Sequence, residues 1–460
     1  MPRFIALPVG SGDAFYLDRG DWSVLVDGGL DETALVTAFQ QATRATSVDV
    51  LICTHNDADH ANGVLGFLDS GMECKEVWLP GKWLGLLPKV LRPTPEVLGD
   101  LFNEVLDEKF VELADVPTPQ MDPLEQLAEA LGKSKTDKDG ISACSRMEDD
   151  APLREADGWP KSLQDQLDVA GDRDGWAWLG PEYGCHPRYL HPYHQMNPAQ
   201  VRLLWAAIDA ARRIQQIATS AFHHGFPVRW FEYDVAARLN GPVGGCAELE
   251  PLNAKEITRI PPVGELLWEL ALSVANRESL VFWSPPTDEF PGVLFNADSD
   301  LARVSLPSNL TNAISTAPHH GSEANAKAYV AIAGKENADS ITWVRSDGKY
   351  RRNPGARYLS QNHRLCTICR LANGAWSTAT QTVVRLVAQG GVWAAQTPVC
   401  TCVIATNLAR CTAPKRGHRK PSARAACPAC GGGYRATDPA GASEGGSAEH
   451  ILAQLSGDES

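Results

Sequence analysis

The chain has 460 residues, of which 43% are apolar, and a formal net charge of −14. This length allows two or three domains with a substantial core. The net negative charge excludes a protein that binds nucleic acid over its whole surface, because such a surface needs an excess of Lys and Arg to attract phosphates. No apolar run approaches the roughly 18 residues of a membrane span, and the start runs into a strand-like segment without a secretory leader. We therefore expect a cytoplasmic protein with no membrane partner.

The first 80 residues begin with short strands and continue into α/β alternation. Apolar runs of strand length are separated by Gly-rich turns at Gly10-Ser11-Gly12-Asp13 and Gly20-Asp21. The expected elements are strands at 4–9, 14–17, 23–26, 48–53 and 76–79 and helices over 32–44 and 61–70. This order of elements predicts the α/β class.

The segment Thr54-His55-Asn56-Asp57-Ala58-Asp59-His60 directly follows the apolar strand at 48–53. Two imidazoles and two carboxylates on one loop would repel each other or stay unsatisfied unless a positive charge lay among them. A divalent metal is the usual source of that charge. A polar turn with an Asp N-cap is the simpler alternative, but a cap needs one such residue rather than four. The spacing therefore predicts a metal-binding loop.

Residues 81–227 predict a mainly helical insertion with a flexible loop over 133–159. Helical spacing is seen at 98–113, 123–131 and 198–222, and the last helix has Asn197 as its N-cap. α/β character returns in residues 228–360. The expected elements there are strands at 228–233, 279–283, 292–296, 314–317 and 340–344 and helices over 265–274 and 325–333.

Seven of the twelve cysteines lie in the last hundred residues, which predicts a separate Cys-rich, zinc-ribbon-like unit over 361–436. It contains a hairpin with arms at 378–388 and 392–404, and residues 437–460 are expected to be a flexible C-terminus. Cys366-Thr367-Ile368-Cys369 and Cys400-Thr401-Cys402 have the layout of a structural four-thiolate zinc site. Cys411, His418, Cys427 and Cys430 could form another, and spacing leaves the partition open. A reduced tail without metal, or a redox pair, is the alternative.

Two later segments also place metal-type ligands at the end of an apolar strand. One ends in Asp298, and the other contains His319-His320-Gly321-Ser322. Together with Asp27-Gly28-Gly29 and the Thr54–His60 loop, in this order, they resemble the metallo-β-lactamase superfamily. The segments Gly10-Ser11-Gly12-Asp13-Ala14-Phe15, Asn276 with Ser279-Leu280-Val281, and His319-His320-Gly321-Ser322 are most similar to the hydrolase domain of competence DNA-uptake (ComEC-type) proteins. The resemblance covers about residues 3–80 and 228–355.

The resemblance implies an α/β fold, a metallo-β-lactamase-like αββα sandwich built from residues 1–80 and 228–360. It implies that His55 and Asp57 hold one metal, that Asp59 and His60 hold a second and that Asp298 bridges them. One of His319 and His320 completes the second site. Asp59 and His60 are thereby the residues on which catalysis is expected to depend most.

One ligand of the superfamily pattern has no clear counterpart. A further His is usual between the loop and the bridging Asp, but the aligned segment Ala247–Asn253 has none. Glu250 in that segment could substitute as a weak oxygen ligand, or it is a surface acid, as Glu mostly is. The site is therefore expected to hold either one metal or two.

A metal-bound water has a pKa near ~7, and a second metal stabilises charge at the attacked centre. The ligand set suits zinc or manganese. We therefore expect a metal-dependent hydrolase that uses an activated hydroxide, a phosphodiesterase or nuclease with nucleic acid as its partner. Lys349, Arg351 and Arg352 follow Ser346-Asp347-Gly348 and would contact phosphates, unless they form only a solvated basic loop.

Two other functions fit the same residues. The first is a hydrolase of a small ester, lactone or phosphorylated metabolite, because fold does not define substrate. The second is a degenerate sandwich that acts as a scaffold while the zinc-ribbon-like tail binds nucleic acid or a protein. The intact Thr54–His60 loop argues against the scaffold.

Overall fold

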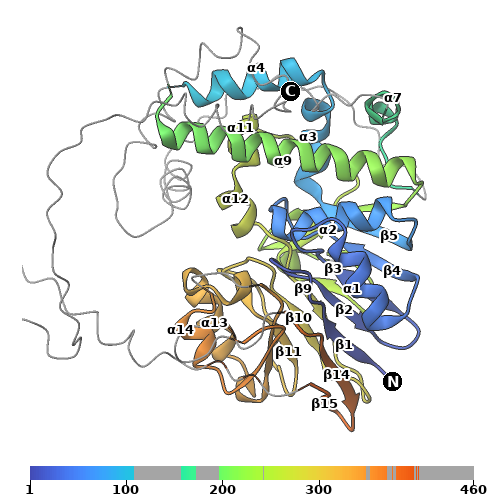
Figure 1. The fold of residues 1–460 in the computed structure, drawn as a ribbon, viewed down its shortest axis with the longest axis vertical. Coiled ribbons are helices and arrows are strands. Elements are labelled where there is room, and N and C mark those ends of the chain that lie inside the picture. Colours follow the sequence, from blue (N-terminus) through green and yellow to red (C-terminus); the bar gives the residue numbers. More distant parts are fainter. Residues whose placement is uncertain are drawn as a thin grey trace, which may run out of the picture.

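The structure is a computed structural model that describes residues 1–107, 157–171, 196–241, 243–348, 353–369, 376, 380–397, 400 and 402. Two β-sheets pack face to face, and helices cover the outer face of each sheet (Figure 1). Three apolar cores separate these four layers. The expected αββα sandwich is confirmed.

The larger sheet has nine strands in the order β15-β14-β1-β2-β3-β4-β5-β6-β8. Side chains alternate across it, so that Phe4 packs between the two sheets and Ile5 packs under the helices. Strands β3 to β6 run parallel, which puts their carboxyl ends at one edge. Its strands are β1 (Arg3–Ala6), β2 (Phe15–Asp18), β3 (Ser23–Val26), β4 (Ser47–Ile52), β5 (Glu73–Pro80), β6 (Val228–Tyr233), β8 (Ala254–Glu256), β14 (Val384–Gln389) and β15 (Val392–Ala395).

The smaller sheet has six strands in the order β13-β12-β11-β10-β9-β7. Strands β10 to β13 run parallel, and β9 and β7 are antiparallel to their neighbours. Helices α13 (Ala326–Ala333) and α14 (Ala356–Leu359) cover its outer face. Its strands are β7 (Glu250–Pro251), β9 (Phe282–Ser284), β10 (Val293–Phe295), β11 (Ile314–Thr316), β12 (Thr342–Arg345) and β13 (His363–Cys366).

The described part of the predicted insertion is helical, as expected, and it belongs to the outer helical layer of the larger sheet. The long helix α9 crosses this layer and packs on α2 (Figure 1). Asn197 caps α9 in a capping box with Gln200, which confirms the predicted start. Residues 108–156, with the predicted helix 123–131, lie outside the described residues. The layer consists of α1 (Ala34–Thr43), α2 (Ala58–Asp69), α3 (Gly81–Val90), α4 (Thr94–Val105), α7 (Lys161–Gly171), α9 (Pro198–His223), α11 (Leu266–Leu270) and α12 (Leu272–Arg277).

The predicted hairpin forms as β14 and β15, but it is not part of a separate unit beginning at residue 361. Strand β14 pairs with β1, and β13 pairs with β12. Both sheets therefore continue through residues that the sequence assigned to the tail. The reason is that β1 and β12 would otherwise be edge strands with unpaired backbone groups. Residues 403–460, including the expected flexible C-terminus, lie outside the described residues.

Within the described ranges, none of the helices combines the length and the apolar character that crossing a membrane requires.

Candidate metal centre

The predicted ligands come from three loops that follow strand ends. Residues 54–57 join β4 to α2, Asp59 and His60 lie in the first turn of α2, Asp298 follows β10, and His319 and His320 follow β11. We call the side chains that these loops bring together the His/Asp centre: His55, Asp57, Asp59, His60, Asp298, His319 and His320. Because the strands that precede these loops belong to both sheets, the centre lies where the two halves of the sandwich meet.

Each imidazole of the His/Asp centre has an oxygen atom close to its Nδ1 atom. For His60 it belongs to Asp27, whose Oδ2 lies 2.8 Å from Nδ1 in a hydrogen bond. For His320 it belongs to Asp13, whose Oδ1 lies 3.1 Å from Nδ1 as an ion-pair contact without hydrogen-bond geometry. Both carboxylates are buried. A carboxylate on Nδ1 holds the proton there and makes Nε2 the metal-binding atom.

His55 and His319 follow the same pattern with neutral partners. The Thr54 hydroxyl donates to Asp27 at 2.8 Å, so it accepts from Nδ1 of His55 at 2.9 Å. The amide nitrogen of Asn325 donates to the Asp298 carbonyl, so its oxygen accepts from Nδ1 of His319 at 3.0 Å. In both rings Nε2 is left with a lone pair, as a metal ligand requires.

The four Nε2 atoms point to two carboxylates. Asp298 Oδ1 lies 3.1 Å from Nε2 of His60, and its Oδ2 lies 3.5 Å from that of His319 and 3.7 Å from that of His55. Asp59 Oδ2 lies 3.1 Å from Nε2 of His320. The two oxygens of Asp298 therefore face different imidazoles.

The donor atoms form two groups that share Asp298. One contains His55, Asp57 and Asp298, and the other contains Asp13, His60, Asp298 and His320, with the atoms of each group within 4.8 Å of one another. Asp13 faces Nδ1 of His320 while Asp59 faces its Nε2, so we regard Asp59 as the ligand and Asp13 as the group that orients the ring.

The buried donors lack hydrogen-bond partners of their own. Both oxygens of Asp298 and the Nε2 atoms of His55, His60 and His320 are buried without one. Unpartnered buried polar atoms are costly in a protein interior. Divalent metals would satisfy all of them at once, so the residues present fit one metal in each group.

The charged groups of the centre shift one another's pKa values. Burial would raise the pKa of Asp298, but His319, His60 and His320 hold it well below its ordinary value. Burial would lower the pKa of His60, but Asp298 and Asp27 raise it well above its ordinary value. Burial raises the pKa of Asp13 to about 6, although His320 opposes the shift. Asp298 is therefore a carboxylate with negative charge available to a metal.

Several residues at the centre have left-handed backbone conformations. Asp27, Ala297, His319 and His320 have φ values of 60°, 46°, 46° and 54°. Such conformations cost about 1–3 kcal/mol each in residues other than glycine and often mark functional sites. Gly12, at φ +96°, allows the close approach of its loop, because a Cβ there would overlap the carbonyl oxygen of Asp59.

All seven predicted ligands lie in the centre, and two further findings bear on the choices left open. His320 belongs to the group with His60, while His319 faces the other oxygen of Asp298. Glu250 belongs to neither group and pairs with Arg238 at 3.1 Å, which favours a surface acid. Asp57 is also the N-cap of α2, so the capping alternative holds for that one residue. Lys349, Arg351 and Arg352 lie outside the described residues.

Asp13 and Asp27 are the functional candidates to which the sequence assigned no role. Both stand in segments that carried the family resemblance, at the end of a Gly-rich turn and in an Asp-Gly-Gly sequence. That position was the only available signal, because each contacts a histidine from a different loop.

A second group of metal-type ligands lies beside β13. We call Cys366, Cys369, Cys400 and Cys402 the cysteine cluster; their sulfur atoms lie within 4.8 Å of one another. Sulfur–sulfur distances are 3.4 Å for Cys366–Cys400, 3.6 Å for Cys369–Cys400 and 3.9 Å for Cys366–Cys402. Of the open partitions, the structure thus brings these four together. Cys411, His418, Cys427 and Cys430 lie outside the described residues.

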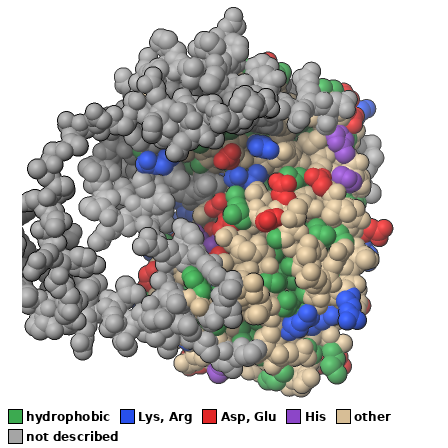
Figure 2. All heavy atoms as spheres, viewed as in Figure 1, with side chains coloured by type: hydrophobic (Ala, Val, Ile, Leu, Met, Phe, Trp, Pro, Cys, Tyr) green, Lys and Arg blue, Asp and Glu red, His purple; other side chains and the backbone are tan. Residues whose placement is uncertain are grey.

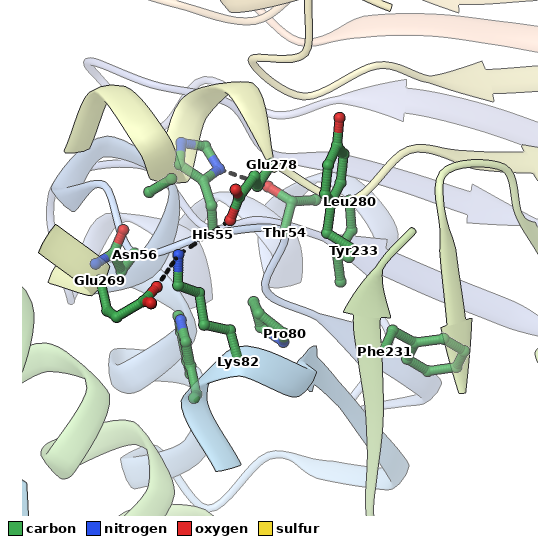
Figure 3. A pocket seen from close by; sticks show the side chains of 12 residues that line it. Thr54, His55, Asn56, Pro80, Lys82, Phe231, Tyr233, Glu269, Glu278 and Leu280 are labelled. Carbon is green, nitrogen blue, oxygen red and sulfur yellow. Dashed lines mark hydrogen bonds and ion pairs between the residues drawn. The ribbon is translucent and has the colours of Figure 1, made fainter. Parts of the chain in front are cut away.

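A pocket opens beside His55 and encloses about 400 Å³, counting its mouth. Trp83, Phe231, Tyr233 and Leu280 form apolar parts of its wall. Lys82 projects into it between two carboxylates, with its Nζ 2.6 Å from Glu269 and 3.0 Å from Glu278 (Figure 3).

The described surface carries both signs of charge on the face seen in Figure 2. Acidic side chains gather across its middle, and Lys and Arg side chains lie above and below them. This part of the surface is therefore not a continuous basic patch.

The fold and the His/Asp centre together are those of a metal-binding αββα sandwich, and they support a metal-dependent hydrolase. The sequence model of the metallo-beta-lactamase superfamily matches residues 7–75 of the chain. The match contains the Thr54–His60 loop but neither Asp298 nor the histidine pair. A search of curated proteins found no match. The closer similarity to competence-type hydrolase domains stays a prediction.

Proposed function

We propose that this chain is a metal-dependent phosphodiesterase that acts on nucleic acid. The observation that carries the proposal is the position of Asp298, whose two oxygens face donors of two separate groups. Two metals sharing a ligand are typical of phosphatases and nucleases. Divalent metals bound there would supply a water of lowered pKa and would stabilise negative charge on the phosphoryl oxygens.

The residues of the centre divide into holding and orienting roles. His55 and Asp57, with His319 nearby, would hold one metal, and Asp59, His60 and His320 would hold the other. Asp298 would contribute to both. Asp27 and Asp13 keep the protons on Nδ1 of His60 and His320 and so direct Nε2 toward the metals. Mixed imidazole and carboxylate donors suit zinc or manganese.

The pocket beside His55 gives the substrate a place next to the metals. Of its aromatic side chains, Trp83 and Phe231 are buried, so only the half-buried Tyr233 would contact a base or sugar, while the phosphodiester would lie at the mouth toward the centre. Lys349, Arg351 and Arg352 are proposed to contact flanking phosphates.

The test is hydrolysis of bis(p-nitrophenyl) phosphate and of single-stranded and duplex oligonucleotides, with zinc or manganese added. We compare the wild type with Asp59→Asn, which weakens a ligand, and with Asp288→Asn, which changes an exposed carboxylate. We expect cleavage by the wild type and by Asp288→Asn, and a loss of roughly 10²–10³-fold in Asp59→Asn. Equal rates in all three proteins would contradict the proposal.

A second candidate is a hydrolase of a small ester, lactone or phosphorylated metabolite. The observation in its favour is the state of Lys82, which two glutamates neutralise, so the pocket is not a cationic phosphate site. An uncharged ester or lactone would meet no repulsion there. Turnover of p-nitrophenyl acetate or a lactone, without turnover of any phosphodiester, would establish this candidate in place of the first.

A further inference from the structure

The sulfur geometry of the cysteine cluster is that of a site for one tetrahedral metal ion. Zinc–sulfur bonds of about 2.3 Å place tetrahedral thiolates about 3.8 Å apart. The observed distances of 3.4, 3.6 and 3.9 Å lie close to that value. Ligands of an iron–sulfur cluster bind different iron atoms and lie further apart. The backbone N–H of Cys402 also points at the Cys400 sulfur, at 3.4 Å, as groups around a thiolate often do.

The cysteine cluster is connected to the His/Asp centre by the side chain of Arg345. Arg345 is fully buried. Its Nη1 donates to the carbonyl of Ile368, between the first two cysteines of the cluster, at 3.4 Å. Its Nε donates to the carbonyl of His320 at 2.8 Å. We call residues 366–369 the cysteine loop. The Arg345 side chain thus joins this loop to His320, a proposed metal ligand.

The Arg345 guanidinium is also linked to Asp13, the carboxylate that contacts His320. Arg345 Nη2 pairs with Asp347 at 2.6 Å, and Asp347 accepts from the backbone N–H of Gly12 at 3.2 Å, next to Asp13. The Thr367 hydroxyl, inside the cysteine loop, donates to the Asp347 carbonyl at 3.2 Å. The loop therefore supports both His320 and the Asp13 that orients it.

His320 needs such support because its backbone is strained. It follows His319 in a second consecutive left-handed conformation, with φ 54°. A residue with a side chain keeps this conformation only where its surroundings determine it. The hydrogen bond from Arg345 to the His320 carbonyl acts on that very residue.

We propose that Cys366, Cys369, Cys400 and Cys402 bind a structural zinc ion, and that the loop it fixes holds Arg345 as a positioning residue for His320. The zinc part stands alone, whereas the positioning part rests on the His/Asp centre being the metal centre of the proposed function. The ligand is one Zn²⁺ ion with four thiolates, in a site that takes no part in hydrolysis.

Cobalt substitution reports on the two sites separately. Co²⁺ with four thiolates gives strong charge-transfer absorption in the near ultraviolet, whereas Co²⁺ with imidazole and carboxylate ligands gives only weak visible bands. We expect the wild type to show both signals. The variant Cys369→Ser/Cys402→Ser should lose the thiolate signal and one zinc per chain, while Cys74→Ser, on β5, should lose neither. An unchanged zinc content in the double variant would overturn the zinc site.

The positioning role is tested by Arg345→Lys, with Arg357→Lys as an exposed control. We expect Arg345→Lys to keep the thiolate signal and to bind Co²⁺ or Mn²⁺ at the His/Asp centre about 10–100-fold more weakly. Unchanged affinity there would overturn the positioning role. Neither readout depends on turnover, so a protein that shows both effects yet hydrolyses nothing refutes the proposed function alone.

Thiol titration of the wild type covers the case in which the double cysteine variant fails to fold. Adding p-hydroxymercuribenzoate in steps to the native protein should release one zinc as the cluster thiols react, measured with a colorimetric zinc indicator. Zinc release that does not follow thiol modification would overturn the site. Thr367→Val, which removes only the hydroxyl link to Asp347, should weaken metal binding at the His/Asp centre by less than Arg345→Lys does.

Discussion

The His/Asp centre collects its side chains from three loops that belong to both sheets, whereas the cysteine cluster draws on two short segments beside one edge strand. The first offers oxygen and nitrogen donors next to an open pocket. The second offers four sulfur donors, of which Cys366 and Cys402 are buried among apolar side chains. Catalytic metal sites keep a position open for substrate, and structural sites are closed. The first site thus has the features of a catalytic site as proposed above, and the second has those of a structural site.

The largest expected effect comes from Asp298→Ala, which removes the shared ligand. The centre should lose both metals. Hydrolysis should then fall by at least ~10³-fold, because the metals no longer stabilise the negative charge of the transition state. The zinc of the cysteine cluster should remain. Elemental analysis and turnover measure the two effects, with Asp300→Asn in the same loop as control. If Asp298→Ala also loses the zinc of the cysteine cluster, the two sites do not bind metal independently.

Chelation should separate the two sites in time. An excess of EDTA is expected to remove metal from the His/Asp centre, which lies beside a pocket, before it removes zinc from the four thiolates. Activity should therefore disappear while the melting temperature is still close to its starting value, and later zinc loss should lower the melting temperature. The measurements are residual activity, metal content and thermal unfolding on the same samples. A single simultaneous phase would contradict the assignment.

A smaller effect is expected from Asp13→Asn, which keeps the shape of the side chain but removes the charge that orients His320. Loss of such a partner typically weakens metal binding by ~10–100-fold. Calorimetric titration with Mn²⁺ measures this change. The control Asp31→Asn alters an exposed carboxylate before α1 and should bind metal as the wild type does. If Asp13→Asn binds equally well, Asp13 has no orienting role.

The smallest effect should follow Lys82→Met, which leaves Glu269 and Glu278 in the pocket without a cation. An anionic substrate would meet two uncompensated carboxylates, so KM should rise by about tenfold, equivalent to ~1.4 kcal/mol. Metal content and kcat should stay near the wild-type values, and Lys82→Arg should preserve KM. A loss of metal in Lys82→Met would show that the pocket and the centre cannot be treated separately.

The sequence predicted those features whose signals lie close together along the chain. The Thr54–His60 loop was identifiable because four ligands stand within six residues. The strands at 23–26 and 228–233 have the predicted bounds, because their apolar runs end at clear turn signals.

The features that were not predicted depend on contacts between distant segments. Asp13 acquires its role only where the fold brings His320 to it, and Arg345 only where its side chain reaches the carbonyl of His320. The boundary at 361 was wrong because cysteine content marks a composition, whereas sheet membership depends on pairing with β1 and β12. No local pattern reports such pairing.

The pairing of β1 with β14 also affects how the chain folds. Arg3 lies opposite Val387, so β1 receives β14 as a neighbour only after the residues between them have been synthesised. Contacts so distant in sequence form slowly, because the entropy of closing the loop must be overcome first. Until β14 is synthesised, one edge of β1 stays unpaired and could pair with strands of other chains. The larger sheet is thus complete only after all the predicted ligands of the centre have been synthesised.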